Sequence, residues 1–519
     1  MGWSDRFLEA LQGDVHTPRF YLEVAKEPSC PGATGVIFYS HQSTAESDPA
    51  YAISTMGVRV SSGSISLLSW SQSFGGLVVG IHGGSDHAIT ILQSCVRGSI
   101  VRLFCGFDGW DYADFETIFI GQVRQFRGTP ERGYRLECWD IVRALGTRWT
   151  TTANQAALFY NLRVLATTTI ATSAYSINDS TLEVASSASF ERETGGNYLI
   201  RVTDNSSGTF LRVASSVSSD VFTILNPTSE VYGTEMEAAD VGNKVEHMAI
   251  LQDGPVDIVK KLLLSTGTGT AHASFDKYPA NWGFGVPLDW VDLDDIDEVM
   301  SSYQVDLTWD LDVVVTAEQT NPISWLQGIL GPCGFWLVQR QGQISMRPAQ
   351  NPYLSSIAAD FHIRDIDIDS VLDWQAWDGS RAVEYLSIKV NDAAASYSVT
   401  STEAIATLPS TGTYEITLDH VWKTASTNRE KATADVDLRT EIWAHRIPER
   451  VSLLLTGLTY AGLCEGDLGL LTSAIIPSRD ISGMDSRRCM VLSCTPDWLG
   501  GVVRLDLGIV ATWASDFPP

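Results

Sequence analysis

The same short pattern stands near both ends of the 519-residue chain. Thr129-Pro130-Glu131-Arg132-Gly133 runs into Arg135-Leu136-Glu137, and Thr495-Pro496-Asp497-Trp498 runs through Gly500-Gly501 into Arg504-Leu505-Asp506. Each copy is typical of a β-hairpin, a turn segment followed by an alternating strand. Gly98-Ser99-Ile100, with Leu103, precedes the first copy by 31 residues (129 − 98), and Gly466-Asp467-Leu468, with Leu471, precedes the second by 29 (495 − 466). The paired spacing predicts one β unit that is built twice.

Composition indicates an ordinary globular protein of several domains. Hydrophobic residues make up 44% of the chain and charged residues 19%, and this length predicts roughly three or four domains of about 100 to 200 residues each. The 35 basic residues are outnumbered by 62 acidic ones, for a net charge of −27. This balance argues against a protein that grips nucleic-acid backbones, because such proteins need clustered Lys and Arg. The acidity serves either solubility or an acidic channel wall.

The amino terminus and the apolar windows predict a soluble chain without a membrane anchor. Met1-Gly2-Trp3-Ser4-Asp5-Arg6 lacks a basic segment followed by an apolar run, and Arg6 stands where a myristoylation signal needs Ser or Thr. The apolar stretch from Leu67 to Ile81 is interrupted by Ser, Gln and Gly, and it is shorter than the roughly 20 apolar residues that span a bilayer. We therefore expect neither a secretory nor a lipid signal.

The eight cysteines do not have the spacing of a zinc or redox motif. Cys105 and Cys138 lie in apolar, strand-like runs, where a small buried thiol is expected. Cys464, Cys489 and Cys494 form one cluster near the carboxyl end, but the sequence offers no identifiable fourth ligand for a metal or iron–sulfur site. We predict buried thiols, no metal site, and assembly in a reducing cytosol.

Residue patterns divide the chain into four predicted domains and indicate a mostly β protein with a few helices. Residues 1–150 alternate like strands, with Phe20, Leu22 and Val24 on one face, which predicts a first β-barrel or sandwich. Residues 160–245 predict an inserted small β-barrel, and residues 250–358 an α+β middle domain. Residues 359–519 predict a second β-barrel, similar to the first, with one long helix.

Proline and polar caps mark the expected helices. Pro255 opens a helix over 254–265 with Val256, Val259, Leu262 and Leu263 on one stripe, and Asn321-Pro322 opens another over 322–330. A hairpin is expected over 335–347, with Gly342 in its turn. A long helix is expected from near Thr427-Asn428, with Ala434, Leu438, Ile442 and His445 recurring on one face, and Pro448 ends it.

Candidates for catalysis or metal binding are sparse. His82 and His87 flank Gly83-Gly84-Ser85-Asp86, and a His-Asp-His group can ligate a metal or supply a base, although turn-rich segments carry surface polar residues by default. A run of acidic residues lacks the Gly and the final Glu of an EF-hand and more simply supplies negative charge to a helix N-terminus; it comprises Asp289, Asp292, Asp294, Asp295, Asp297 and Glu298. Esterase, phosphate-loop and zinc-protease motifs are not found in the sequence. We predict no catalytic, cofactor-binding or metal-binding residue.

Aromatic residues raise a third possibility, a sugar-binding adhesin. The chain has 16 Trp and 16 Tyr residues, and aromatic faces stack on sugar rings. Trp282-Gly283-Phe284-Gly285 followed by Trp290 is the best candidate for an exposed aromatic patch. At a subunit interface the same residues would instead serve as buried anchors.

Four features, taken in order, resemble one family. They are the Pro255 helix, the Pro322 helix with its hairpin, the long helix followed by Leu458-Thr459-Tyr460-Ala461-Gly462-Leu463-Cys464-Glu465-Gly466-Asp467, and the closing Thr495-Pro496-Asp497-Trp498 hairpin. With these features the chain resembles the baseplate hub (tail hub) proteins of long-tailed bacteriophages and of related prophage or gene-transfer particles. The resemblance covers most of residues 90 to 510.

The resemblance implies a structural virion protein at the tail tip or baseplate, assembled in the host cytoplasm. It implies a homotrimer in which two similar barrels per chain alternate around a ring, matching a six-fold tail tube above and a three-fold tip below. The implied partners are a distal tail or tail-tube protein above and tip, tape-measure or fibre proteins below, with genomic DNA passing without specific binding. The 160–245 barrel would lie on the outer surface as a docking or carbohydrate-facing module. The alternatives are a tail-associated carbohydrate-binding adhesin and, further off, a cell-wall hydrolase.

Overall fold

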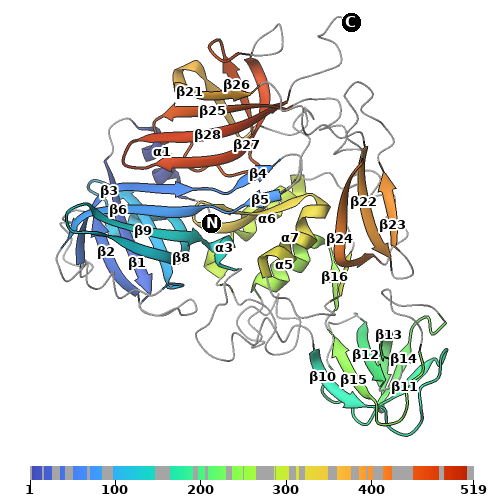
Figure 1. Ribbon diagram of the computed structural model, residues 1–519. Coiled ribbons are helices and arrows are strands. Elements are labelled where there is room, and N and C mark those ends of the chain that lie inside the picture. Colours follow the sequence, from blue (N-terminus) through green and yellow to red (C-terminus); the bar gives the residue numbers. More distant parts are fainter. Residues whose placement is uncertain are drawn as a thin grey trace, which may run out of the picture.

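The fold is mostly β and built of several sheets, as the sequence predicts (Figure 1). The computed structural model describes residues 3–13, 17–25, 35–40, 51–66, 71–84, 97–145, 164–190, 197–204, 208–228, 237–248, 250–264, 286, 288–302, 311–314, 322–348, 359–375, 385–392, 396–400, 413–423, 448–477 and 484–510. Among the helices in these ranges, none is long and apolar enough to cross a membrane.

Seven strands of the amino-terminal region close into a barrel. Their order is β2 (Gly35–Ser40), β1 (Pro18–Ala25), β7 (Ile100–Phe107), β8 (Glu116–Thr129), β9 (Gly133–Asp140), β6 (Gly76–Gly84) and β3 (Tyr51–Ser61), which returns to β2 in parallel. The predicted inward face of β1 is confirmed, since Phe20, Leu22 and Val24 are buried. Short elements accompany the barrel: α1 (Asp5–Gln12), β4 (Ser64–Ser66), β5 (Ser71–Ser73), η1 (Tyr112–Asp114) and α3 (Ile141–Ala144).

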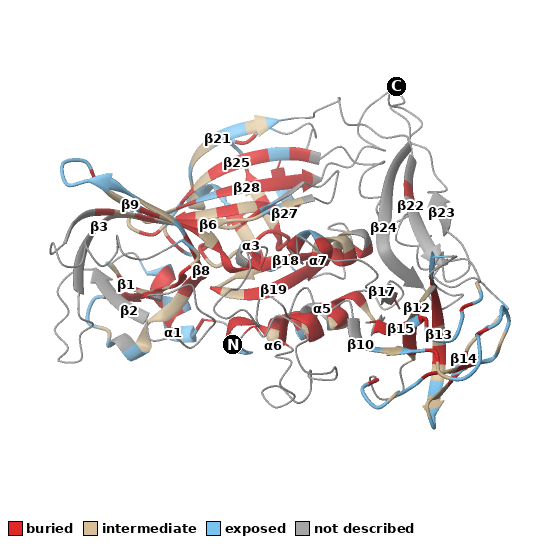
Figure 2. Ribbon diagram, turned by 60° about the horizontal axis from the view of Figure 1, so that its bottom comes forward, coloured by how far each residue is buried: buried red, intermediate tan, exposed pale blue. Residues whose placement is uncertain are grey.

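Six strands from the carboxyl-terminal region extend the same sheet. They lie in the order β20 (Phe361–Arg364), β26 (Leu468–Ser473), β27 (Met484–Asp497), β28 (Val502–Val510), β25 (Pro448–Thr456) and β21 (Ile368–Gln375), with η5 (Asp365–Asp367) between β20 and β21. We call these strands the second β unit, and the strands β1, β7, β8, β9, β6 and β3 the first β unit. Figure 2 shows how buried residues line β25 and β28 of the second unit and continue into β6 of the first.

The two units are copies of one another at the level of single hydrogen bonds. Gly98 has φ +94° and Gly466 has φ +95°. The Gly98 N–H donates to the Val123 carbonyl (2.8 Å) and the Val123 N–H donates to Ser99 (2.8 Å); the Gly466 N–H donates to Val491 (2.9 Å) and Val491 to Asp467 (2.9 Å). Both glycines therefore stand 25 residues before their valine (123 − 98 and 491 − 466). The predicted equivalence of Gly98 with Gly466 is confirmed.

Irregularities in the ladders repeat as well. A bulge follows Val123 in β8 and the corresponding Val491 in β27. Another lies between Thr55 and Gly57 of β3 and between Ile368 and Ser370 of β21. Because each bulge shifts which side chains face the core, two shared bulges indicate one structural unit present twice. The units differ at both edges: β1 runs antiparallel to β7 but β20 runs parallel to β26, and β21 has a further bulge after Val371 that β3 lacks.

The repeated hairpins are confirmed, but part of their predicted alignment is wrong. Strand pairing makes Arg135-Leu136-Glu137 equivalent to Arg504-Leu505-Asp506, as expected. The same pairing sets Thr495 against Arg504 and Arg127 against Arg135, so Thr495 corresponds to Arg127 and Asp497 to Thr129. The two Thr-Pro pairs are offset by two residues because one precedes a turn and the other lies within a strand.

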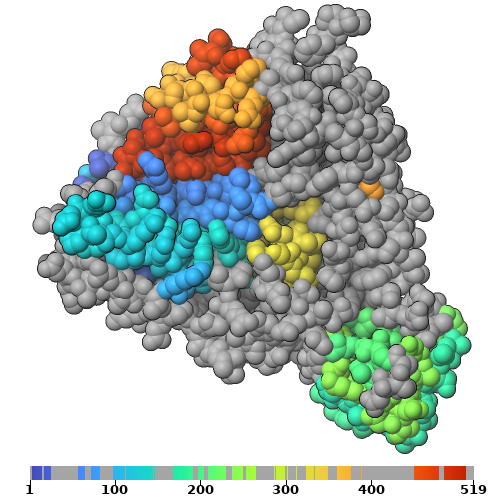
Figure 3. Space-filling model, viewed as in Figure 1, coloured from blue at the N-terminus to red at the C-terminus, as the bar shows by residue number. Residues whose placement is uncertain are grey.

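Residues 164–248 hold a separate small barrel. Its strands run in the order β10 (Val164–Thr169), β15 (Lys244–Met248), β12 (Tyr198–Asp204), β13 (Gly208–Ser218), β14 (Val221–Ile224) and β11 (Thr181–Glu183). An antiparallel bridge between Ile170 and Val184 joins the last strand to the first. The barrel projects from the rest of the described chain at the lower right of Figures 1 and 3. Its last strand continues past the predicted boundary at 245.

The middle region combines helices, a hairpin and a five-stranded sheet. The helices are α5 (Pro255–Leu264), η2 (Leu288–Trp290), α6 (Leu293–Ser302), α7 (Pro322–Leu330) and η4 (Gly331–Cys333); the hairpin is β18 (Phe335–Arg340) with β19 (Gln343–Pro348). The sheet runs β16 (Ile250–Asp253), β17 (Leu311–Val314), β24 (Thr413–Lys423), β22 (Tyr385–Asp392) and β23 (Ser396–Thr400). This sheet crosses the predicted boundary at 358.

Two of the three predicted helices and the hairpin are confirmed. Pro255 and Pro322 are the first residues of α5 and α7, and the expected stripe of α5 is buried. In the hairpin turn both Gln341 (φ +49°) and Gly342 (φ +80°) are left-handed, the geometry of a type I′ turn. The predicted long helix from Thr427 to His445 lies outside the described residues.

Candidate functional site

The two β units meet along one contact, which we call the internal seam. It is formed by residues 58–62, at the end of β3 and just beyond it, and by residues 494–498, at the tip of the β27–β28 hairpin. The Ser62 N–H donates to the Cys494 carbonyl (2.8 Å), the Cys494 N–H donates to Ser62 Oγ (2.8 Å), and the Trp498 N–H donates to the Val58 carbonyl (3.1 Å). Arg59 Nε lies 3.3 Å from Asp497 Oδ2. The hairpin of the second unit thus docks onto the β3 edge of the first.

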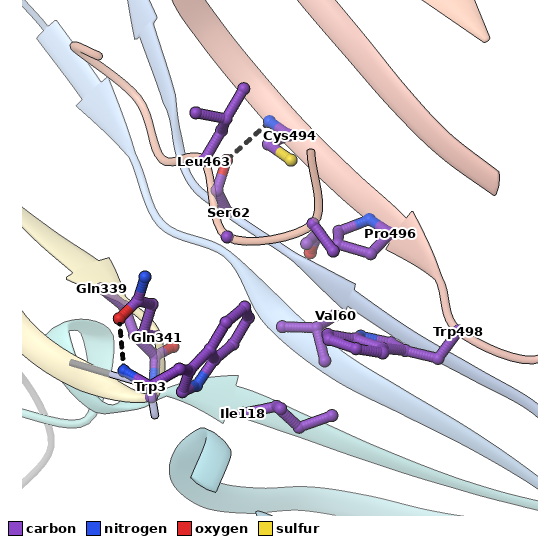
Figure 4. Close-up of a pocket in the computed structure, with 14 residues that line it drawn as sticks. Trp3, Val60, Ser62, Ile118, Gln339, Gln341, Leu463, Cys494, Pro496 and Trp498 are labelled. Atoms are coloured by element: carbon purple, nitrogen blue, oxygen red, sulfur yellow. Dashed lines mark hydrogen bonds between the residues drawn. The ribbon is translucent and has the colours of Figure 1, made fainter. Parts of the chain in front are cut away.

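The amino-terminal helix fixes this seam from one side. Ser4 caps α1, and Trp3 packs edge-on against Trp498 with ring centroids 5.9 Å apart. The Trp3 indole N–H donates to the Thr117 carbonyl (2.8 Å), and its backbone N–H donates to Gln341 Oε1 (2.9 Å). One residue therefore contacts the first unit, the second unit and the middle hairpin together (Figure 4). Burying aromatic rings in this way stabilises the junction strongly.

A cavity at the junction is too small for an organic ligand. Its volume is about 30 Å³, which is room for one or two water molecules, whereas small-molecule sites enclose roughly 300–1,000 Å³. Figure 4 shows side chains from both units and the middle hairpin around it. The cavity is a packing gap between domains rather than a binding pocket.

A buried ionic cluster locks the middle region to the second unit. Arg347 of β19 donates through Nε to Asp467 (2.9 Å) and through Nη1 to Asp295 of α6 (2.6 Å). Arg340 and Ser345 also contact Asp295. Burial raises the pKa of Asp295, but the hydrogen bond and charge of Arg347 outweigh it and hold that pKa below its ordinary value. Because each charge is paired, the cluster fixes geometry without leaving an uncompensated ion.

Gly466 allows this cluster to form beside the second unit. Its φ of +95° is left-handed, and a Cβ at this position would lie 2.8 Å from Cβ of Arg347. Any larger residue would both strain the backbone and push Arg347 away from Asp467. Gly466, the counterpart of Gly98, therefore also leaves room for Arg347 of the middle region.

Two further carboxyl groups are buried close to the junction. Burial, with a smaller contribution from the charge of Glu465, raises the pKa of Asp140 to about 7, and burial raises the pKa of Glu465 to about 7. Asp140 caps α3 by accepting from the Arg143 N–H (2.7 Å), and Glu465 accepts from Gln72 (3.2 Å). Asp140 is the last residue of β9 in the first unit and Glu465 precedes β26 of the second, so the charge of Glu465 acts on Asp140 across the junction.

The prediction of buried thiols is confirmed for the cysteines named below, which the structure describes. Cys105 and Cys138 are buried and free, as are Cys464, Cys489 and Cys494. Cys464 lies against Asp467, whereas Cys494 lies against the Tyr460 carbonyl. Within the described ranges, no three His, Cys, Asp or Glu side chains gather in a group that could hold a metal ion.

The other sequence candidates are not brought together into a site. The backbone of His82 belongs to β6, and His87 lies outside the described residues. Asp294 and Asp295 stand in the first turn of α6, as the helix N-terminus interpretation expects. Trp290 is only 3% exposed, so it is a core residue and not part of an exposed patch; 282–285 lie outside the described residues.

The ionic cluster is the feature that sequence reasoning missed. Arg347 and Ser345 stand among apolar residues of the predicted hairpin, and a charged residue in such a run signals a buried partner. Asp467 lies directly after the shared glycine. Nothing in the spacing, however, links Arg347 to Asp295.

Comparisons with known proteins find similarity among solved structures only. No family model and no curated protein matches the chain. The chain is similar to a tail protein from Neisseria meningitidis MC58, at 9% identity and a TM-score of 0.40 over 97% of this chain and 100% of that one. It is also similar to the 43 kDa tail protein of prophage MuSo2 from Shewanella oneidensis, at 9% identity and a TM-score of 0.38 over 95% and 98%. A chain from the virion of a native gene transfer agent particle is 16% identical, with a TM-score of 0.18 over 47% and 85%.

Proposed function

We propose that this chain is a structural component of a phage-type tail, a homotrimeric hub that closes the distal end of the tail tube. One observation carries the proposal: the chain contains a similar β unit twice, with two shared bulges, the same hairpin register and the same left-handed glycine. A homotrimer of such a chain would present six similar modules around one axis. A particle with a six-fold tube above and a three-fold tip below needs this kind of adaptor.

The packing between the units suits a ring whose geometry must not vary. Hydrogen bonds, Trp3 and the ion pair of Arg59 with Asp497 fix the first unit against the second at the internal seam. The Arg347 cluster then ties the second unit to the middle region. In a ring of six modules, three of the six contacts between modules would be internal seams and would have this fixed geometry.

The proposed partners follow from the position at the tail tip. A distal tail or tail-tube protein would bind one face of the ring, and tip, tape-measure or fibre proteins the other. The small barrel of residues 164–248 projects outward in Figure 3, so it would be free to act as the docking or carbohydrate-facing module. Assembly would take place in the host cytoplasm.

The net charge suits a channel through which DNA passes without binding. With 62 acidic against 35 basic residues, part of the excess would line the lumen and repel the phosphate backbone during ejection. A neutral or basic lumen in the assembled ring would contradict this part of the proposal.

Electron microscopy of the purified full chain mixed with tail-tube protein of the same genome tests the function. The proposal expects a three-fold ring with six similar lobes, seated on tube ends. Tubes that stay uncapped, with the chain binding glycans on an array, would favour the adhesin instead. Clearing of peptidoglycan on a zymogram would favour the hydrolase.

A further inference from the structure

Among the residues that the structure describes, the counterparts of the two surfaces at the internal seam make no equivalent contact. Inside the chain, β3 of the first unit receives the β27–β28 hairpin of the second. The counterpart of β3 is β21, and the counterpart of that hairpin is the β8–β9 hairpin. In the part of the chain that the structure describes, β21 pairs with β25 alone. Figure 1 places β21 at the top edge of the sheet and the β8–β9 hairpin near its lower end.

Strand register gives the equivalences residue by residue. Val58 pairs with Val79 in the first unit, and Val371 pairs with Leu453 in the second. Because Val79 and Leu453 occupy the same position of their strands, Val58 corresponds to Val371. Arg59 lies opposite Val78 and Asp373 lies opposite the equivalent Ser452, so the two correspond, although a bulge after Val371 inserts Leu372, for which β3 has no counterpart. At the hairpin tip Asp497 corresponds to Thr129.

These two surfaces carry complementary charge. The edge of β21 exposes Asp369 and Asp373, together with Leu372, which is 46% exposed. The tip of the β8–β9 hairpin exposes Arg132 and Arg135 together with one acid, Glu131, so its balance is basic. The signs are opposite to those of the internal pair, in which the strand carries Arg59 and the hairpin carries Asp497, but attraction is preserved.

Exposed acids on an edge strand would by themselves only discourage pairing with other chains. The β21 edge, however, corresponds to the β3 edge, which already receives a hairpin inside the molecule, and the equivalent β8–β9 hairpin is basic. Together these observations identify a second copy of this chain as the partner. A contact that joins two different surfaces of identical chains is head-to-tail, and such contacts close into rings when the rotation allows it.

We propose that the β21 edge of one chain receives the β8–β9 hairpin of a second copy of this chain, in the position that the internal seam uses. Pro130 stands where the internal hairpin has Trp498, so the counterpart of the Trp498–Val58 hydrogen bond does not form and charge pairing takes its place. Asp373 faces Thr129 and Arg132 of the neighbour, and Leu372 is covered. This inference rests on the proposed homotrimer and names the surfaces that hold it together. Three internal seams and three subunit contacts then alternate around the ring.

Cysteine cross-linking of the full chain tests the contact. The variant Asp373→Cys with Thr129→Cys places two thiols at positions equivalent to Arg59 and Asp497, which are directly paired residues of β3 and β27, a separation that a disulfide can bridge. The positive control is Arg59→Cys with Asp497→Cys, which should form a bond within one chain. The matched negative control is Thr129→Cys with Ile177→Cys, because Ile177 is exposed on the small barrel.

Mild oxidation followed by non-reducing gel electrophoresis should convert the test pair into covalent dimers and trimers, with the trimer as the largest species. The negative control should stay monomeric. If light scattering reports a trimer but the test pair gives no cross-link, the contact is overturned and the hub proposal stands. If no oligomer forms, alone or on the tail tube, both fail. A ladder beyond the trimer would mean an open filament and would overturn the ring.

Discussion

Replacing Arg347 by Met tests whether the buried cluster holds the middle region to the second unit. Arg347 is 5% exposed and pairs with two carboxylates, Asp295 and Asp467. Met keeps most of the side-chain volume but leaves Asp467 without its arginine, while Asp295 keeps Arg340. Removing one partner of a buried ion pair costs about 3–5 kcal/mol. That is a large part of the roughly 5–15 kcal/mol that stabilises a typical domain.

Differential scanning calorimetry and urea unfolding measure the loss. For a cooperative unit of about 150–250 residues the cost should lower Tm by roughly 10 °C. Arg504→Met is the matched control, because Arg504 is exposed on β28 and exposed substitutions cost only about 0.5 kcal/mol. If the free energies of unfolding of the two variants differ by less than about 1 kcal/mol, the cluster does not stabilise the junction and the reasoning fails.

Three further predictions follow from single contacts. Gly466→Ala should lower the free energy of unfolding more than Gly457→Ala. Both glycines have a left-handed φ, so each change costs about 1–2 kcal/mol of backbone strain, but only at position 466 would the new Cβ also lie 2.8 Å from Arg347. Equal losses of stability in urea unfolding would contradict this. Asp140→Asn keeps the cap of α3 and should stabilise the protein at pH 8 but not at pH 4. The folded pKa of Asp140 is raised to about 7 from an ordinary value of 3.8, so the native state holds a proton that the unfolded state has released, and stability falls as pH rises from about 4 to 7, by at most about 4 kcal/mol. A difference between wild type and variant that does not change with pH would refute it. Asp373→Arg should weaken the trimer several-fold at low salt, and Arg132→Asp in the same chain should restore it, as measured by analytical ultracentrifugation; no rescue would show that the two charges do not meet.

Much of the fold was predictable because local signals and tertiary packing agree. Pro255 and Pro322 each begin a helix whose apolar stripe is buried. Gly98 and Gly466 were recognisable as equivalent because a left-handed backbone position selects glycine, and that requirement is the same in both copies.

Other features depend on contacts that a linear pattern does not record. The two Thr-Pro pairs look equivalent in sequence, but strand pairing shifts them by two residues. The five-stranded sheet pairs β17 with β24, and the paired residues Asp312 and Trp422 are 110 positions apart (422 − 312), which periodicity alone does not reveal. Arg347, Asp295 and Asp467 come from three elements, and only the fold brings them together.

The mass of the purified chain in solution tests the central claim most directly. One chain has a mass of 56.7 kDa. Light scattering, alone and after mixing with the tail-tube protein of the same genome, should report a trimer of about 170 kDa, or a monomer that becomes a trimer on the tube. A stable monomer that does not bind the tube would contradict both the proposed hub function and the six-module ring.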